Sequence, residues 1–275
     1  MRWRVALAVG IVGAALAPVS TAEALRVLVF NSSRFVDSGQ TYLGPESQES
    51  DNLQAALKAL GHSVTAIAGP FDAVGDCPGL PAEGPKQPGT LLATAAEYAA
   101  ALGSADVFVL PEQESWCDLP GELLDNPGIG AAWRGWVEHG GALVIHSSEE
   151  ARTKVGSLLD VVFGLRGVGG VDGTDVQTAK TAAAALTQFA AGPAVLRGND
   201  STGLIPLQTL PAGSLSVYDD GAAASVAIIP FGTGKIVFLG WDWTKSDPPF
   251  HGDGVPPFDD DGQNGGWYPL VLDAA

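Results

Sequence analysis

Short apolar runs alternate with amphipathic stretches along the first half of the chain. The apolar runs are continuous, a pattern typical of strands that are buried on both faces of a parallel sheet. These runs predict strands at 25–30, 62–68, 105–110 and 142–145. Apolar residues three or four positions apart predict helices at 46–60, 90–102, 130–139 and 148–163. Regular alternation of the two element types favours a doubly wound α/β sandwich with a mostly parallel sheet.

The second half of the chain has a different pattern, because strands dominate after residue 204. An alanine-rich stretch at 174–191 predicts one more helix before them. Further strands are predicted at 215–218, 224–230 and 234–240. The Gly-containing turn at 231–234 joins the last two of these strands as a β hairpin near the C-terminus.

The N-terminal residues have the pattern of an export signal. Arg2 and Arg4 precede an uncharged apolar run that is too short to span a bilayer comfortably as a helix. Ala22 and Ala24 then give the small-x-small pattern of a cleavage site. We predict cleavage after Ala24, with the cut after Ala22 as second choice and an uncleaved N-terminal anchor as the alternative.

This interpretation divides the chain into a signal peptide, 1–24, and one α/β domain, 25–275. The domain would be exported to the periplasm or the outside of a cell, and the style of the signal is bacterial. Cys77 and Cys117 both lie in the mature part, and an even number of cysteines in an oxidising compartment predicts a disulfide between them.

Composition and charge exclude several classes of protein. The chain is 46% hydrophobic and only 16% charged, which excludes a mainly disordered chain and a coiled coil. Its net charge of −17 repels phosphate backbones, so a nucleic-acid partner is not expected. No later apolar segment is long enough for a membrane helix, and we expect no membrane partner after signal cleavage.

The C-terminal segment, 246–275, is acidic and contains neither Lys nor Arg. Asp259, Asp260 and Asp261 supply the oxygen ligands that calcium prefers. The cluster lacks the glutamate that ends an EF-hand loop, so we expect a solvated acidic loop and no cofactor. Calcium binding by these three residues is the alternative.

Polar residues follow four of the predicted strands. Ligands of open α/β sheets bind outside the carboxyl ends of the strands, where the strand order reverses. The predicted ligand-binding residues, in chain order, are Asn31, Glu112, Gln113, His146, Ser147, Trp241, Asp242 and Trp243. The expected ligand is a small molecule or a carbohydrate, because paired tryptophans can stack on sugar rings. The simpler interpretation is that Trp241 and Trp243 only cover the core at the sheet edge.

A family resemblance rests on three of these stretches. The sequence WVEHGGALVIHS at 136–147 resembles the helix, Gly-Gly, strand and His-Ser stretch of ThuA-like domains, within the class I glutamine amidotransferase-like superfamily. RVLVFN at 26–31 and GTGKIVFLGWD at 232–242 fit the same pattern. The resemblance implies a flavodoxin-like α/β sandwich with a β hairpin near its end.

The chain departs from the amidotransferase pattern at the nucleophile. Those enzymes carry a cysteine on a Gly-x-Cys-x-Gly turn, whereas this turn reads VIHSSE at 144–149. Attack on a glutamine amide in that scheme needs a thiolate, so we expect no glutamine amidotransfer.

His146, Ser147 and Glu112 are the candidates for other catalysis. A Ser147 nucleophile needs a base, and adjacent His146 points the other way on a strand, so His139 or His251 would have to supply it. Glu112 and Glu114 could act as the acid and base of glycoside hydrolysis. The simpler interpretations are a helix N-cap for Ser147 and a hydrogen-bonded, buried side chain for His146.

These observations predict an exported domain that binds a small ligand or carbohydrate. A hydrolase that acts on a sugar-related or ester substrate in the same crevice is the alternative. A structural surface protein is the second alternative.

Overall fold

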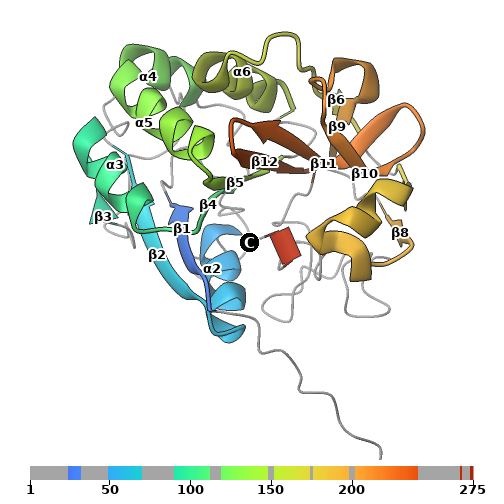
Figure 1. Ribbon diagram of the computed structural model, residues 1–275, viewed down its shortest axis with the longest axis horizontal. Helices are drawn as coiled ribbons and strands as arrows, with labels where there is room; N and C mark the ends of the chain where they lie inside the picture. The colour runs from blue at the N-terminus through green and yellow to red at the C-terminus, as the bar shows by residue number, and fades with distance from the viewer. Residues whose placement is uncertain are drawn as a thin grey trace, which may run out of the picture.

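A twelve-stranded sheet with helices on both faces forms the centre of the protein (Figure 1). The structure is a computed structural model. It describes residues 24–31, 49–69, 90–111, 119–147, 152–173, 176–197 and 202–240, together with 267 and 273–274. The sheet combines a parallel half, built mainly from the first part of the chain, with an antiparallel half built from the second.

Neighbouring strands are parallel throughout the first half of the sheet. Their order is β3 (Thr90–Leu91), β2 (Ser63–Ala68), β1 (Arg26–Phe30), β4 (Val107–Leu110), β5 (Ala142–His146) and β12 (Gly234–Leu239). The chain goes from β1 to β2 and β3 on one side, and then returns to β4 on the other side of β1. The strand order therefore reverses between β1 and β4, as in flavodoxin-like folds. The predicted fold class is confirmed.

The second half of the sheet is antiparallel and begins with the predicted hairpin. From β12 it continues through β11 (Ala223–Phe231), β10 (Leu215–Asp219), β7 (Thr178–Lys180) and β8 (Val195–Leu196). Two further strands lie off this path: β9 (Gly203–Pro206) pairs with β11, and β6 (Val171–Asp172) pairs with β9. The hairpin turn needs glycine at Gly232, where φ is +61° and an added Cβ would lie 2.4 Å from the carbonyl oxygen of Glu138.

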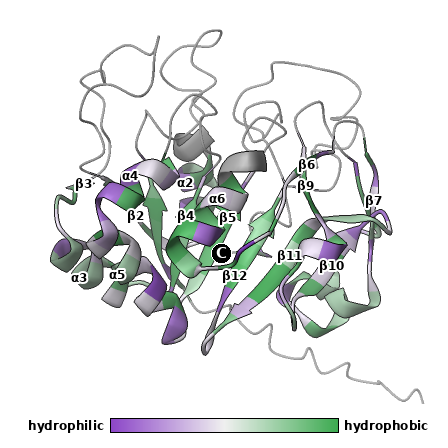
Figure 2. Ribbon diagram, turned by 90° about the horizontal axis from the view of Figure 1, so that it is seen from above, coloured by the Kyte–Doolittle hydropathy of each residue, from purple (hydrophilic) through white to green (hydrophobic). Residues whose placement is uncertain are grey.

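Helices divide between the two faces of the sheet, and the strands between them are mostly hydrophobic (Figures 1 and 2). One face carries α3 (Ala95–Gly103), α4 (Leu119–Asp125), α5 (Pro127–Glu138) and α6 (Arg152–Phe163). The other face carries α2 (Glu49–Ala59) and two 3-10 helices, η1 (Ala182–Leu186) and η2 (Gln188–Ala191). Each face has its own cluster of buried apolar side chains, because successive strand residues point to opposite faces.

The predicted alanine-rich helix at 174–191 is wrong. Within the described residues of this stretch, the chain forms strand β7 and then η1 and η2. Strand β7 pairs with β10 and β8, and these long-range pairs override the helix propensity of alanine. The hydroxyls of Thr181 and Thr187 then accept hydrogen bonds from the backbone N–H groups of Ala183 and Phe189, which starts two short helices.

The end of the chain contributes to the core on the α2 face. Trp267 is fully buried there, and its Nε1–H donates to the carbonyl oxygen of Arg197 at 2.7 Å. Tyr218 donates to the carbonyl oxygen of Pro193, and burial, helped by the nearby charge of Asp273, raises the pKa of Tyr218 to about 12. Of the acidic segment 246–275, the structure describes only residues 267, 273 and 274. Within the described ranges, no helix is long and apolar enough to cross a membrane.

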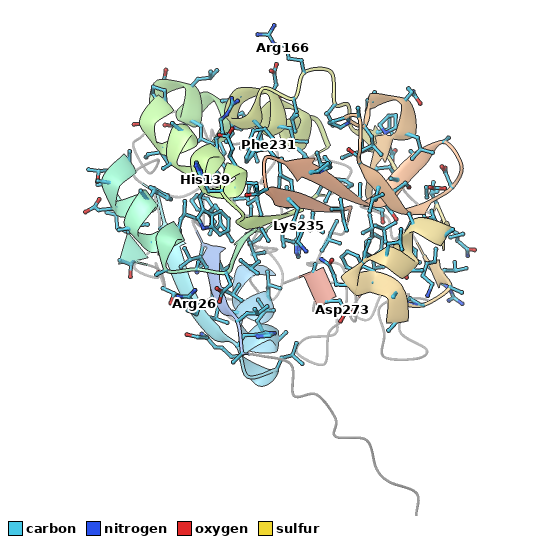
Figure 3. All side chains as sticks on the ribbon, in the orientation of Figure 1. Arg26, His139, Arg166, Phe231, Lys235 and Asp273 are labelled. Atoms are coloured by element: carbon cyan, nitrogen blue, oxygen red, sulfur yellow. The ribbon has the colours of Figure 1, made fainter. Side chains whose placement is uncertain are left out.

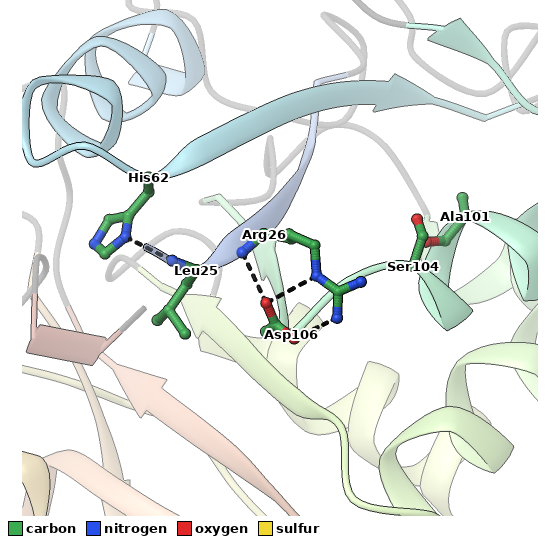
Figure 4. A network of polar contacts seen from close by, with 6 residues as sticks. All are labelled: Leu25, Arg26, His62, Ala101, Ser104 and Asp106. Carbon is green, nitrogen blue, oxygen red and sulfur yellow. Dashed lines mark hydrogen bonds and ion pairs between the residues drawn. The ribbon is translucent and has the colours of Figure 1, made fainter. Parts of the chain in front are cut away.

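An ion pair fixes the start of β1 against the start of β4. Arg26 donates from Nε and from a terminal guanidinium nitrogen to the carboxylate of Asp106, at 3.1 and 2.6 Å, and its backbone N–H donates to the same carboxylate at 2.8 Å (Figure 4). These hydrogen bonds from Arg26 lower the pKa of Asp106 to about 2.

Replacing Asp106 by Asn is expected to destabilise the protein at neutral pH and much less at pH 2.5. The folded pKa of Asp106 lies below the value of about 3.9 for an unfolded Asp. The ion pair therefore stabilises the fold above pH 4, and this contribution is lost as the pH falls from about 4 to about 2. Urea unfolding of both proteins at pH 7, 4 and 2.5 measures the difference.

Asp160→Asn is the matched control, because Asp160 makes a looser ion pair with Arg166, at 3.7 Å between exposed side chains. Its effect on the free energy of unfolding should be small at every pH. Equal effects of the two substitutions at pH 7, or a D106N effect that persists unchanged at pH 2.5, would contradict the prediction.

Candidate functional site

The carboxyl ends of the parallel strands meet along one edge of the sheet, which we call the carboxyl edge. Asn31 follows β1, Pro111 follows β4, His146 ends β5 and Gly240 follows β12. Because β1, β4, β5 and β12 are consecutive in the sheet, these residues form a row. The row begins at the point where the strand order reverses, the usual ligand position in such folds.

Buried polar side chains concentrate at this edge. The described residues include seven buried polar side chains, and all except Gln54, on α2, lie at strand ends there. The six are Asn31, His146, Ser147, Thr178, Thr202 and Ser225. The rest of the described core is apolar. Burying polar groups costs free energy unless they are hydrogen bonded, so their collection at one edge needs an explanation.

Asn31 lies at the switch point and is only 3% exposed. Its backbone N–H donates to the carbonyl oxygen of Ile67 at 2.7 Å, which extends the β1–β2 ladder by one residue. Within the described part of the chain, no acceptor lies within hydrogen-bonding distance of its side-chain Nδ2. A buried amide donor of this kind is suited to an acceptor on a ligand.

His146 shares the face of Asn31. Val29 and Val144 belong to the apolar cluster on the α2 face, so strand alternation directs Asn31 and His146 to that face as well. One strand, β4, separates them, which corresponds to about 10 Å between backbones. Burial lowers the pKa of His146 to about 3, so its ring is neutral at neutral pH. A neutral imidazole offers one hydrogen-bond donor and one acceptor.

Ser147 is fully buried at the same edge, and its backbone N–H donates to the carbonyl oxygen of Leu239 at 2.9 Å. Ile145 belongs to the apolar cluster on the α5 face, and side chains two positions apart point to the same face of a strand. Ser147 is therefore directed to the α5 face, opposite to His146. His139, weighed as a base for Ser147, is excluded by its position. It ends α5 before β5 begins (Figure 3), where its Nδ1 lies 2.6 Å from the carbonyl oxygen of Gly135, and a whole strand separates it from Ser147.

A pair of hydroxyl side chains extends the row beyond β12. Thr178 Oγ1 and Ser225 Oγ are 2.7 Å apart, and both residues are buried. Gly240 connects this pair to the row, because its N–H donates to the carbonyl oxygen of Ser225 and its own carbonyl accepts from Gly203 N–H. Sequence analysis missed Thr178 and Ser225. Their pairing requires the starts of β7 and β11 to lie together, whereas the sequence around Thr178 predicts a helix.

Several predicted residues lie outside the described part of the chain. They are Glu112, Gln113, Trp241, Asp242 and Trp243 of the predicted ligand site, Cys77 and Cys117 of the predicted disulfide, Asp259, Asp260 and Asp261 of the acidic cluster, and His251.

Two other features of the described residues do not involve this row. A cavity of about 220 Å³ between α4, α5 and α6 is lined mainly by apolar side chains and by Arg134. Lys235, near the other end of β12 (Figure 3), donates to the Oε1 of Gln188 at 3.3 Å, and burial lowers its pKa. Among the described residues, no group of three or more His, Cys, Asp or Glu side chains is arranged to hold a metal ion.

Comparison with solved structures supports the fold. Two proteins of Salmonella typhimurium are similar over nearly their whole length. Cytoplasmic protein STM1381 has a TM-score of 0.53 at 13% identity, with 90% of this chain and 98% of that chain covered. Cytoplasmic protein STM3548 has a TM-score of 0.50 at 11% identity, with 90% and 95% covered. At these identities the likeness shows a shared α/β architecture alone.

A third solved structure is more distant. The exo-β-1,4-mannosidase Op5Man5 of Opitutaceae bacterium strain TAV5 has a TM-score of 0.46 at 13% identity, and the match covers 92% of this chain but only 36% of the mannosidase. No protein-family model matches the chain, and no curated protein matches it either.

Proposed function

We propose that the protein is an exported binding domain that holds a small polar ligand, of the carbohydrate class, at the carboxyl edge of its sheet. The supporting observation is the row of buried polar side chains, which begins with the Asn31 amide at the switch point. Asn31 and His146 supply hydrogen-bond donors and an acceptor on one face, about 10 Å apart. A hydroxyl-rich ligand has matching acceptors and donors.

The site chemistry favours binding over the amidotransferase reaction, which the missing cysteine already disfavours. A neutral His146 that leaves the strand opposite to Ser147 provides no base for a serine nucleophile. We therefore assign His146 a hydrogen-bonding role. Hydrolysis of a sugar-related or ester substrate is the alternative, which turnover assays on any ligand found would reveal.

Asn31→Leu is expected to abolish ligand binding without lowering the stability of the free protein. The substitution removes a buried donor that has no acceptor among the described residues, and it keeps a similar volume. A ligand at about 100 times its Kd stabilises the native state by about 2.7 kcal/mol, or roughly 5–10 °C in Tm. The measurement is thermal unfolding of chain 25–275 with a panel of mono- and oligosaccharides.

Asn126→Leu is the matched control. Asn126 Nδ2 donates to the carbonyl oxygen of Glu122 at 2.9 Å, at the start of α5 on the opposite face of the sheet from Asn31. Its loss should cost about 0.5–1.5 kcal/mol and leave the ligand-induced rise in Tm intact. A panel with no stabilising sugar, or an unchanged rise in the Asn31→Leu protein, would sink the proposal.

A further inference from the structure

Both backbone N–H groups at the start of β1 are bound by side chains from neighbouring strands. The N–H of Leu25 donates to Nδ1 of His62 at 3.2 Å, and the N–H of Arg26 donates to the carboxylate of Asp106 at 2.8 Å (Figure 4). His62 immediately precedes β2, and Asp106 immediately precedes β4. The residue directly before each neighbouring strand thus supplies a side-chain acceptor to the start of β1.

Within the described part of the chain, which begins at Ala24, Leu25 is the first residue whose backbone is hydrogen bonded to a neighbouring strand or its flanking residue. The carbonyl oxygen of Leu25 accepts from the N–H of Ser63 at 2.9 Å, and its side chain packs against the α2-face cluster. Ala24, directly before it, is exposed. Among the described residues, which begin at Ala24, tertiary contacts therefore begin at Leu25, the residue that follows the small-x-small pattern of Ala22 and Ala24.

We propose that Leu25 is the first residue of the mature protein and that His62 binds its α-amine. The inference rests on the export part of the proposed function and is independent of the ligand. Two observations of different origin point to the same peptide bond: the cleavage pattern in the sequence, and the hydrogen bond of Leu25 N–H to His62, the first tertiary hydrogen bond among the described residues. They favour the cut after Ala24 over the cut after Ala22.

Signal peptidase would hydrolyse the Ala24–Leu25 peptide bond with one water molecule. The carbonyl carbon of Ala24 takes the hydroxyl, and the nitrogen of Leu25 takes the proton. The new α-amine is mostly an ammonium group at neutral pH. One of its N–H groups donates to His62 Nδ1, which requires the neutral ring with its proton on Nε2. Cleavage thereby replaces a neutral hydrogen bond by a stronger, charge-assisted one.

The intact mass of the full chain after export by a bacterial host tests the cleavage site. The expected mass is that of residues 25–275. A mass that begins at Glu23, at any other residue, or at Met1 would overturn the assignment of Leu25.

A double-mutant cycle tests the role of His62. The chains begin at Leu25 or at Thr21, each with His62, His62→Ala or His62→Gln. His62→Ala should lower the Tm of the Leu25 chain by roughly 2–4 °C, and of the longer chain by clearly less. His62→Gln should lose less than His62→Ala, because the side-chain oxygen of glutamine also accepts a hydrogen bond. Equal losses in the two chains would overturn the role of His62, and neither measurement depends on the sugar screen.

Discussion

Trp133→Ala is expected to lower the free energy of unfolding by about 3–5 kcal/mol, because it removes the largest buried ring on the α5 face of the sheet. Trp133 on α5 is fully buried. Its ring packs edge-on against Phe108 of β4, with 5.0 Å between centroids, and against Phe30 of β1, at 6.1 Å. It also packs at a tilt against Tyr98 of α3, at 5.9 Å. The truncation leaves a cavity where two helices meet the two strands of the switch point.

Chemical denaturation of the Trp133 variants measures the loss. Trp133→Phe is the conservative control, with an expected cost below about 1.5 kcal/mol. The Nε1–H of Trp133 has no acceptor among the described residues, so phenylalanine removes no hydrogen bond that the structure describes. Leu124→Ala should have little effect, because Leu124 is 62% exposed. Equal stabilities of the Ala and Phe variants of Trp133 would contradict the described packing of this ring against β1 and β4.

Gly240→Ala is expected to destabilise the protein by about 3–4 kcal/mol and to distort the carboxyl edge. An added Cβ at this position would lie 1.7 Å from the carbonyl oxygen of Gly203. Relief of this overlap must move β9 away from β12, which breaks the Gly203 N–H to Gly240 hydrogen bond of 3.1 Å. The measurements are the Tm and the ligand-induced change in Tm, which should both fall.

Gly103→Ala provides the comparison for the Gly240 variant. Gly103 ends α3, and an added Cβ there would have no neighbour within 4 Å. Alanine at this position should leave the stability unchanged or raise it slightly, since alanine has less backbone freedom in the unfolded chain. A Gly240→Ala protein as stable as Gly103→Ala would show that β9 does not contact the end of β12 as described.

Local patterns were sufficient for the elements of the parallel half. The continuous apolar runs at 25–30 and 142–145 correspond to β1 and β5. A strand that is buried on both faces needs apolar side chains at successive positions, so its sequence is recognisable locally. The predicted helix at 90–102 is partly right. Its first residues form edge strand β3, and α3 starts after Thr94, whose hydroxyl and Glu97 form a capping box.

The same reasoning failed where long-range pairing competes with local propensity. Residues 182–186 are rich in alanine, yet the threonines at 181 and 187 and the pairing of β7 limit this stretch to short 3-10 turns. The short strands β6, β8 and β9 have no pattern of their own. They exist because partners from other parts of the sequence offer hydrogen bonds: β6 pairs with β9, β8 with β7, and β9 with β11.

The sequence by itself determined the parallel α/β class and the polar residues that follow β1 and β5, because burial and strand ends leave local patterns in the chain. Only the tertiary structure decided the strand order, which places Asn31 and His146 on one face with β4 between them. It alone showed that Thr178 and Ser225 extend their row and that His139 lies at the opposite edge. The physical reason is that hydrogen bonds between strands join residues far apart in sequence, so no local pattern encodes which strand ends become neighbours.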